Sequence, residues 1–595
     1  MNESKDNVST IRNIIYLIKV LWKSDIWIFV FFINSVLFSA AIPYIYILAP
    51  KIILTAILEN VGFSEWVLLL IVMFFTIVIL TVLSAFFTEK FKTHITITRN
   101  GCFGKMLSEK MMKMKYDLLE NTDIQNLCYR ANTLFWSENS GIAGVFDNLK
   151  KLVAGVLTLL GLIIILVKLH PLIPIILGIS ASINIVFIIK RKKNENLNRP
   201  IKAELERRMR YVNLTMRDVD INKDIRIFNM TKWLSDWFNG ISIKAINNTK
   251  NVQRKLFKFD FFIIITDIIR EICVLGYIIY AAYMKQFLID DFILYVTSSV
   301  VFSTTLVSLL EYLFSIRQFA EQTNDFINVM NLEEDKSTRS KIFEKWSHIY
   351  MKNISYKYHD NEEFALKNIN IEIQRGEKIS VVGVNGAGKT TLLKVLIGLY
   401  TQNGGEIVIQ DINGEQFQNI NRYELFSVVF QQIFQYAFSL EENVALEDKN
   451  EIIPSKLEVA LNLSGLIEVV NNLPKGANTL LRKEFDPEGI TLSYGQAQLL
   501  ALARVIYRDT SIVVLDEPIS ALDPIIERDF YHKFKLLFKN KTCIFVSHRL
   551  SSVLFSDKII LLDNGTISDI GKHDELLKRN EIYKNMWETQ SKRYK

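Results

Sequence analysis

The pattern of hydrophobic and polar positions divides the chain into two parts. Residues 26–50 and 66–88 contain no Asp, Glu, Lys or Arg, and each run is long enough to cross the roughly 30 Å of hydrocarbon in a bilayer as a helix. Further apolar segments bring the expected number of membrane spans to six; they cover residues 152–167, 172–189, 261–284 and 292–310. From about residue 342, short strand-like runs alternate with glycine turns and amphipathic helices, a pattern typical of a soluble α/β domain.

These patterns predict the domain organisation. Residues 1–330 form an α-helical membrane domain, the charged stretch 331–341 is a linker, and residues 342–595 form a separate α/β domain that is large enough to bury its own core. Residues 11–22 have apolar positions at helical spacing with basic residues between them, which predicts a short amphipathic helix on the inner membrane surface. The alternative is that this stretch is merely the start of the first span.

Basic residues are concentrated in two segments, between spans two and three and between spans four and five. They are Lys90, Lys92, Arg99, Lys105, Lys110, Lys113, Lys115 and Arg130 in the first, and Lys190, Arg191, Lys192, Lys193, Arg207, Arg208 and Arg210 in the second. Because positive charge is retained on the cytoplasmic side, both segments and both chain termini are expected there. The segments lack Pro/Gly clusters and are expected to extend the spans as helices.

Composition agrees with a membrane protein that does not bind nucleic acid. Half of the residues are hydrophobic (50%), and 39 are phenylalanine. A net charge of +7 over 595 residues is small and is explained by basic cytoplasmic segments. The four cysteines are scattered without a CxxC spacing, so neither a disulfide framework nor a zinc site is predicted.

Ionisable residues inside the predicted spans are candidates for a substrate cavity. Asp267, Arg270 and Glu271 lie in the fifth span, and Glu311 follows the sixth. A charge in hydrocarbon is costly unless it is paired or faces water, so these residues are functional candidates. The alternative is a structural pair of Asp267 with Arg270, three residues apart on one helix face near the cytoplasmic mouth.

Residues 383–390 have the sequence GVNGAGKT and lie between the apolar run 379–382 and a helical run that begins near Thr391. A strand, a glycine-rich loop and a helix in this order form a P-loop, whose backbone N–H groups and helix N-terminus bind phosphate. Lys389 is expected to reach the β and γ phosphates, and the Thr390 hydroxyl to ligate Mg²⁺. The candidate ATP-binding residues of this stretch are Gly383, Asn385, Gly386, Gly388, Lys389, Thr390 and Thr391.

A second strand ends in two acidic residues, Asp516 and Glu517. A carboxylate at the end of a strand beside a P-loop is placed to hold Mg²⁺, and this role is assigned to Asp516. Glu517 follows directly and is expected to orient or deprotonate the attacking water. The expected cofactors are therefore ATP and Mg²⁺, and the expected fold class is an α-helical membrane domain with an α/β P-loop ATPase domain.

Other motifs of the soluble domain resemble those of ABC transporter ATPase domains in order and spacing. They are Leu492-Ser493-Tyr494-Gly495-Gln496 (signature), Gln431 after a short strand (Q-loop), Ser520-Ala521-Leu522-Asp523 (D-loop) and Ser547-His548-Arg549 (H-loop). Six spans with long cytoplasmic helices resemble the exporter type of half-transporter. The resemblance therefore extends over nearly the whole chain.

The resemblance implies roles for further residues. Tyr358 corresponds to the aromatic that stacks on adenine, Gln431 to a Mg²⁺ and water contact, and His548 to a γ-phosphate contact. Glu517, His548 and Gln431 are thus the expected catalytic residues. Ser493, Gly495 and Gln496 would contact ATP held by a second chain, and Asp523 would belong to the D-loop. Tyr494 stands where the family usually has glycine.

The resemblance also implies a cycle. ATP would close two ATPase domains, and hydrolysis would let them separate, so an active molecule needs a second half-transporter. A homodimer is preferred because Glu517, His548 and Ser493 are all present, and a heterodimer is the alternative. Residues 117–126 and 218–224 resemble the coupling helices of the family, although either could be a plain solvated loop.

Short strings in this chain are similar to those of bacterial exporters of ribosomally made peptides, including lantibiotic-type exporters. They are residues 364–369, 428–431 and 485–489. The expected function is ATP-driven export of such a peptide from the bacterial plasma membrane. Export of a lipid or hydrophobic drug is one alternative, and an ATPase-gated membrane sensor is an alternative of another class.

Overall fold

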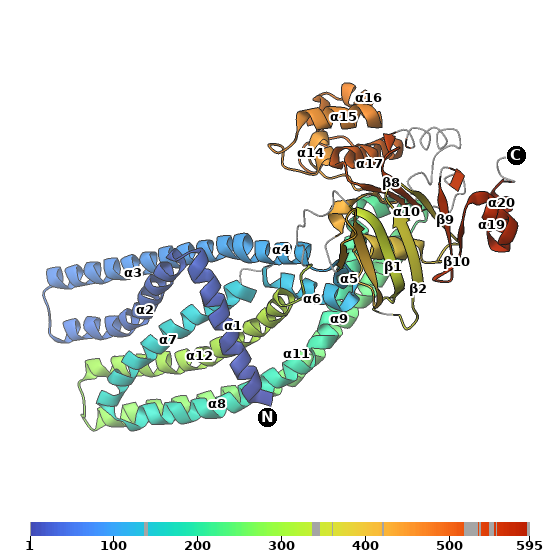
Figure 1. Cartoon of the computed structure of the whole chain (residues 1–595). Helices are drawn as coiled ribbons and strands as arrows, with labels where there is room; N and C mark the ends of the chain where they lie inside the picture. Colours follow the sequence, from blue (N-terminus) through green and yellow to red (C-terminus); the bar gives the residue numbers. More distant parts are fainter. Residues whose placement is uncertain are drawn as a thin grey trace. The chain divides into compact units, whose positions relative to one another are not determined.

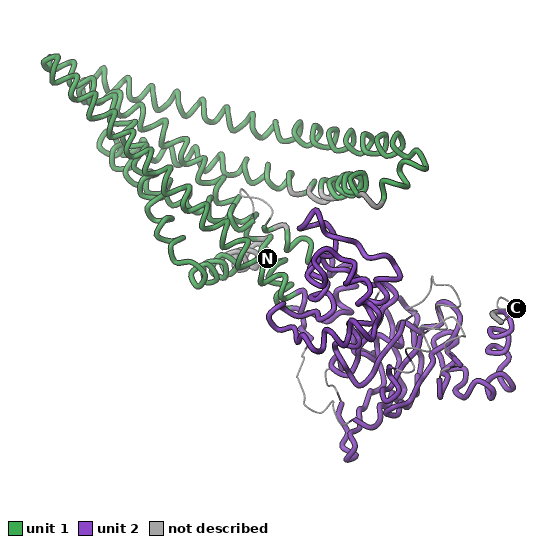
Figure 2. Tube along the Cα trace, turned by 90° about the horizontal axis from the view of Figure 1, so that it is seen from above, with its two compact units in different colours: residues 1–110, 127–331 green, residues 111–126, 332–595 purple. Residues whose placement is uncertain are grey.

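The computed structural model describes residues 2–135, 141–335, 346–359, 361–418, 422–516, 534, 537–546, 553–554 and 556–591. The chain forms two compact units (Figure 2): residues 1–110 with 127–331, and residues 111–126 with 332–595. The short segment 111–126 therefore belongs to the second unit, although it lies in the first half of the sequence.

The first unit consists of helices (Figure 1). They are α1 (Asn2–Ser24), α2 (Trp27–Leu58), α3 (Phe63–Thr98), the π-helix η1 (Arg99–Gly104), α4 (Lys105–Lys113), α6 (Thr122–Asn132), the short 3₁₀ turn η2 (Thr133–Phe135), α7 (Gly141–Leu169), α8 (Leu172–Leu197), α9 (Arg199–Arg217), α10 (Val219–Ile227), α11 (Thr231–Tyr283) and α12 (Ile289–Met330). Helices α4 and α6 each continue into the segment that belongs to the second unit.

In the described part of the chain, five helices are long and apolar enough to cross a membrane: Trp27–Leu58, Phe63–Lys113, Gly141–Leu169, Leu172–Glu195 and Ile289–Met330. The predicted span 261–284 lies, except for its last residue, within α11 (Thr231–Tyr283), a continuous helix of 53 residues. It differs from these five because three charged residues, Asp267, Arg270 and Glu271, fall within it. Large apolar side chains of α3, including Leu68, Val72 and Phe75, are exposed, as expected for a surface that faces lipid.

The core of the first unit is formed by α2, α7, α8, α11 and α12. Among its buried members are Ile47, Leu162, Leu177, Val274 and Phe302. Helix α1 is separate from α2, because it ends at Ser24 and α2 begins at Trp27. On α1, Asn13 is fully buried and its Nδ2 donates to Ala320 O (3.0 Å) and Asn324 Oδ1 (2.7 Å) of α12. A separate helix at residues 11–22 was one of the two sequence alternatives; its position on the membrane surface remains a prediction.

The second unit contains two sheets (Figure 1). One has the order β2-β1-β4-β5 and is antiparallel; the other has the order β10-β9-β3-β8-β7-β6 and is parallel except for the edge strand β10. The strands are β1 (Trp346–Tyr356), β2 (Leu366–Gln374), β3 (Lys378–Val382), β4 (Gly404–Asp411), β5 (Gln416–Gln418), β6 (Phe426–Val429), β7 (Ile512–Asp516), β8 (Thr542–Val546), β9 (Lys558–Asp563) and β10 (Thr566–Gly571).

Helices of the second unit pack on these sheets or form a small helical group. They are α5 (Tyr116–Glu120), α13 (Lys389–Ile397), α14 (Leu440–Ala445), α15 (Pro454–Ser464), α16 (Ile467–Asn471), α17 (Tyr494–Arg508), α19 (His573–Arg579) and α20 (Glu581–Ser591), with 3₁₀ turns η4 (Tyr423–Leu425) and η5 (Gly476–Asn478). The main core lies between the two sheets and α13, and a second core joins α14, α15, α16 and α17. Strands β3, β7 and β8 are mostly apolar, and apart from the first residue of β3 they are buried, because they are central and covered on both faces.

Candidate ATP site and a polar network in the helical unit

The glycine-rich loop connects β3 to α13, as the sequence pattern predicts. Gly386 and Gly388 have φ values of +82° and +98°, a region in which a side chain is strained. At Gly383 a Cβ atom would lie 2.3 Å from Leu562 O, so glycine is required there by the neighbouring strand β9. The loop can therefore approach a ligand with its backbone, which is what phosphate binding requires.

Lys389 is the first residue of α13 and is buried, with 7% of its surface exposed. Its Nζ donates to Gly383 O (2.9 Å) and Val384 O (3.0 Å), so the ammonium group lies over the loop. Val384, Asn385 and Gly386 are exposed and form the rim of the loop. A bound phosphate would meet one fixed positive charge and the N-terminus of a nine-residue helix.

Two of the predicted ATP-binding residues contact each other directly. The hydroxyl groups of Tyr358 and Thr391 are 2.8 Å apart. Tyr358 also packs edge-on against Tyr356 and Tyr400, with ring centroids 5.2 and 5.7 Å apart. Thr391 is buried, whereas Thr390 is exposed beside the loop. Of the two threonines, only Thr390 thus presents its hydroxyl to a ligand at the loop.

Asp516 is the last residue of β7 and is buried, with 5% of its surface exposed. Its backbone is in register with Val546 of β8, and β8 also pairs with β3. The carboxyl ends of these parallel strands meet at one edge of the sheet, so Asp516 and the glycine-rich loop lie on the same edge. Glu517, Asp523 and His548 lie outside the described residues.

The signature residues begin helix α17 (residues 494–508). Ser493 caps this helix: its Oγ accepts from Gln496 N (3.3 Å), and Gln496 Oε1 accepts from Ser493 N (2.9 Å). Gln496, itself a signature residue, therefore holds Ser493 in place through these two hydrogen bonds. Tyr494 is 46% exposed at the first helical position and leaves Gly495 uncrowded, because a Cβ atom there would have no neighbour within 4 Å. The tyrosine is accommodated without distortion of the helix start.

A residue that the sequence did not single out supports this motif. The Gln435 side chain accepts from Leu492 N (3.0 Å) and donates to Leu492 O (3.3 Å). It thereby connects the segment that follows Gln431 to the residue before Ser493. Gln431 itself is exposed just after β6. No sequence signal marks Gln435, since it lies 57 residues from its partner.

A second unpredicted cluster lies around Glu120 of α5, in the segment that belongs to the second unit. Tyr400 donates a short hydrogen bond to the Glu120 carboxylate, and Lys394 Nζ lies 3.0 Å from Glu120 Oε1. Burial alone would raise the pKa of Glu120, but hydrogen bonds from Tyr400 and Lys394 outweigh it and hold this pKa below its usual range. Tyr400 stacks on Tyr356 at 4.8 Å, beside Tyr358. Tyr400 thus contacts both Glu120 and Tyr358, the predicted adenine-stacking residue.

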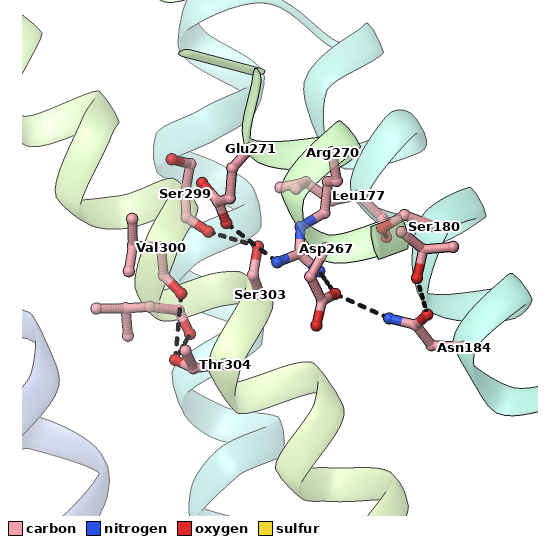
Figure 3. A network of polar contacts seen from close by, with 12 residues as sticks. Leu177, Ser180, Asn184, Asp267, Arg270, Glu271, Ser299, Val300, Ser303 and Thr304 are labelled. Atoms are coloured by element: carbon pink, nitrogen blue, oxygen red, sulfur yellow. Dashed lines mark hydrogen bonds and ion pairs between the residues drawn. The ribbon is translucent and has the colours of Figure 1, made fainter. Parts of the chain in front are cut away.

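In the first unit, a polar network joins α8 and α11 (Figure 3). Arg270 Nη1 donates to Asp267 Oδ1 (2.6 Å), and Asn184 Nδ2 donates to the same oxygen (2.9 Å). Arg270 Nη2 donates to Glu271 Oε1 (3.1 Å). Three of the four predicted cavity residues therefore form one cluster; the fourth, Glu311, is exposed on α12.

A charged contact that the sequence did not predict joins α2 to the start of α12. Lys51 Nζ lies 2.5 Å from Asp291 Oδ1, and Thr55 Oγ1 donates to Asp290 Oδ2 (2.8 Å). The partners are 240 positions apart in the Lys51–Asp291 pair and 235 apart in the Thr55–Asp290 pair. The apolar pattern locates the spans but contains no information about which ends meet.

Comparison with known proteins agrees with the geometry. The family model described as ABC transporter matches residues 366–520. The chain is similar to the subtilin transport ATP-binding protein SpaT of Bacillus subtilis, with 28% identity over 533 residues that cover 86% of this chain and 85% of the relative. The nisin transport ATP-binding protein NisT of Lactococcus lactis subsp. lactis is 28% identical over 418 residues, 69% and 70% of the two chains.

Other matches are shorter or more distant. An ATP-dependent lipid A-core flippase of Haemophilus influenzae is 32% identical over 239 residues, 40% of each chain. The structure of a bacterial Atm1-family ABC exporter with ATP bound superposes with a TM-score of 0.71 over 95% of this chain and 98% of that chain, at 17% identity. This similarity concerns the fold.

The fold and the matched domain define the class: the chain is a multi-pass membrane protein with an ATP-binding ABC domain that hydrolyses ATP. Within that class, its architecture of one helical membrane part joined to one ATPase domain fits an exporter-type ABC half-transporter. The sequence-based prediction of the family and of the fold class is confirmed.

Proposed function

We propose that the chain exports a ribosomally made peptide from the cytosol outward, driven by ATP. The observation that carries this proposal is that the transporters of subtilin and nisin align over most of this chain, whereas the lipid A-core flippase aligns over 40% of it. The charged network on α11 is a second support, because a lipid or hydrophobic drug would favour an apolar path. Lipid export is the second candidate on the strength of the flippase match.

The two candidates differ in what stimulates ATP hydrolysis. The purified full-length chain in lipid nanodiscs should show faster ATPase activity with a bacterial lantibiotic precursor peptide at micromolar concentration. A scrambled peptide of the same composition and added glycerophospholipids serve as controls. Stimulation by lipid without stimulation by any peptide would favour the second candidate.

We further propose that two copies of the chain act together. Ser493 is exposed at the start of α17, with Gly495 and Gln496 beside it, so the signature is available to ATP held on another chain. ATP would then lie between the loop at residues 383–390 of one copy and this signature of the other. Because ATP contacts both faces only when they are closed, its binding favours the closed pair, and hydrolysis removes that preference.

Mg²⁺ fits the donors at the edge of the sheet. Thr390 presents an exposed hydroxyl beside the loop, and Asp516 places a carboxylate at the same edge; Gln431 lies exposed after β6 and would supply an amide oxygen. Oxygen donors of this kind suit Mg²⁺. The ion would neutralise negative charge that develops on the phosphates, while Lys389 holds their oxygens.

Residues outside the described part complete the proposed site. Glu517 would accept a proton from the attacking water or orient it, His548 would contact the γ-phosphate, and Asp523 would belong to the surface between the two copies. We place the protein in a bacterial plasma membrane, with both termini in the cytoplasm and six spans including residues 261–284. The basic segments between spans two and three and between spans four and five support this orientation.

We expect Tyr358→Ala to weaken ATP binding about tenfold, because one aromatic ring stacked on a base contributes about 1–3 kcal/mol. Tyr358→Phe is the matched control: it keeps the ring and removes only the hydroxyl that contacts Thr391. Nucleotide affinity measured by fluorescence anisotropy should therefore fall for the alanine variant and stay within about twofold for phenylalanine. Equal affinities for all three proteins would remove Tyr358 from the site.

Glu120→Ala should uncouple peptide binding from ATP hydrolysis. The substitution removes the acceptor shared by Tyr400 and Lys394, which holds the segment 111–126 on the ATPase domain. Because the pKa of Glu120 is held below its usual range, the carboxylate is charged and this contact is present at neutral pH. We expect basal ATPase activity within about twofold and several-fold weaker stimulation by peptide, on the order of 1 kcal/mol of coupling.

The control for this variant is Asp123→Ala, since Asp123 is an exposed acid three residues along the same segment. It should preserve stimulation. If peptide stimulates the ATPase activity of Glu120→Ala as strongly as that of Asp123→Ala and of the natural sequence, the segment does not transmit the signal through Glu120.

A further inference from the structure

Helix α11 carries three ionisable residues, Asp267, Arg270 and Glu271, which we call the α11 triad. The Arg270 side chain is 8% exposed, whereas those of Asp267 and Glu271 are 31% and 30% exposed. Two carboxylates share one guanidinium group, so the triad has a formal charge of −1. The guanidinium is covered by protein, and the two carboxylates remain accessible.

The two carboxylates are not equally stabilised. Asp267 Oδ1 accepts from both Arg270 Nη1 and Asn184 Nδ2, at 2.6 and 2.9 Å. Asn184 is fully buried on α8 and is itself held by Thr266. Glu271 accepts from Arg270 Nη2 at the longer distance of 3.1 Å. The surplus negative charge is therefore assigned to Glu271.

Two serines of α12, Ser299 and Ser303, appear in the same close view as Glu271 and Arg270 (Figure 3). Ser299 and Ser303 donate their hydrogens to backbone carbonyls of their own helix, to Val296 O (2.8 Å) and Ser299 O (2.9 Å). Both serines are buried, so they add no accessible acceptor to the triad. The Glu271 carboxylate is partly exposed and is an acceptor that suits a positively charged group with several N–H donors.

One donor of the triad has no partner. The Arg270 side chain is more than nine-tenths buried. In the described part of the chain, its Nε nevertheless has no hydrogen-bond partner. A buried unpaired donor of this kind calls for an acceptor. A peptide residue offers both complementary groups close together: a carbonyl oxygen for Nε and an ammonium or guanidinium group for Glu271. A free polyamine offers only the second.

We propose that the α11 triad is a binding subsite for a positively charged residue of the exported peptide, a lysine, an arginine or the peptide N-terminus. The proposal rests on peptide export as the function. Glu271 pairs with the cation, and Arg270 is a positioning residue that holds both carboxylates and receives the peptide carbonyl. A surplus negative charge at membrane depth is unfavourable, so a transported cation is attracted to the triad.

The test compares three synthetic peptides of equal length: one with lysines, one with norleucine in their place and one with glutamates. Their affinity for the full-length protein in nanodiscs is measured by thermophoresis, and spermidine is included as a free polyamine. The lysine peptide should bind about tenfold more tightly than the norleucine peptide, and Glu271→Gln should remove that difference. Glu271→Asp keeps the charge and should restore most of it.

Glu65→Gln, an acid in the first turn of α3, is the matched control and should leave the preference unchanged. Equal binding of the lysine and norleucine peptides, or a preference that survives Glu271→Gln, would overturn the subsite. Spermidine binding that depends on Glu271 without any peptide binding would support the cation site and contradict peptide export. Tight binding of all three peptides regardless of their charge would support peptide export and contradict the subsite.

Discussion

Lys389→Ala is expected to lower ATP affinity by about a hundredfold. The ammonium group lies over the loop at residues 383–390 and is held by Gly383 O and Val384 O. There it would make charge-assisted hydrogen bonds to phosphate, whose loss costs about 3 kcal/mol. Equilibrium binding of a fluorescent ATP analogue to the full-length protein measures the change, and ATPase activity should be lost with it.

Lys352→Ala is the matched control for this variant. Lys352 is a half-exposed lysine on β1 whose Nζ lies 3.5 Å from Glu406 Oε1, away from the loop. The Lys352→Ala protein should bind ATP with the same affinity as the natural sequence. A thermal melt should show that both variants are folded. Unchanged ATP affinity of a folded Lys389→Ala protein would contradict the assignment of the phosphate site.

Glu517→Gln should retain ATP binding and lose turnover. The amide has the size of the carboxylate but cannot accept a proton from water, and a general base contributes about 10²–10⁴-fold to the rate. We therefore expect steady-state ATPase activity to fall by at least about a hundredfold, while ATP holds two copies together. Phosphate release measures the first effect, and size-exclusion chromatography with ATP measures the second.

The comparison variant is Glu488→Gln, which neutralises an exposed acid before the signature. It should hydrolyse ATP at close to the natural rate. Multiple turnovers by Glu517→Gln within a few-fold of that rate would remove the general-base role from Glu517. Lost turnover without an ATP-dependent dimer would keep that role and weaken the proposal of two copies.

The parts of the ATP site that could be predicted are those written in contiguous residues. The loop at residues 383–390, the acid at the end of β7 and the helix start at Ser493 each depend on a few neighbouring positions with a physical reason for their spacing. The structure describes Lys389, Asp516 and Ser493 where those motifs indicate. The roles of Glu517, Asp523 and His548 remain predictions.

Contacts between distant residues could not be predicted in this way. Glu120 meets Tyr400 across 280 positions, and Lys51 meets Asp291 across 240. Neither pair has a periodicity or a motif, because such contacts are created by the packing of whole elements. The antiparallel sheet β2-β1-β4-β5 was missed for the same reason: short strand-like runs show that strands exist, while pairing depends on tertiary structure.

The helical unit shows a similar division. Uncharged runs located the apolar helices, but the helices extend well beyond them, since hydropathy marks only the part that meets lipid. The predicted span 261–284 covers the apolar end of α11, which begins at Thr231 and ends at Tyr283. Within that end the sequence singles out Asp267, Arg270 and Glu271, whose role in substrate binding stays a prediction. What the structure adds is the arrangement of the two carboxylates around Arg270.

Transport itself tests the central proposal most directly. Inside-out vesicles that contain only this chain are supplied with a radiolabelled lantibiotic precursor peptide, with ATP or with a non-hydrolysable analogue. We expect ATP-dependent uptake into the vesicles that is absent with the analogue and with Glu517→Gln. Active ATP hydrolysis without uptake of any such peptide would contradict the account.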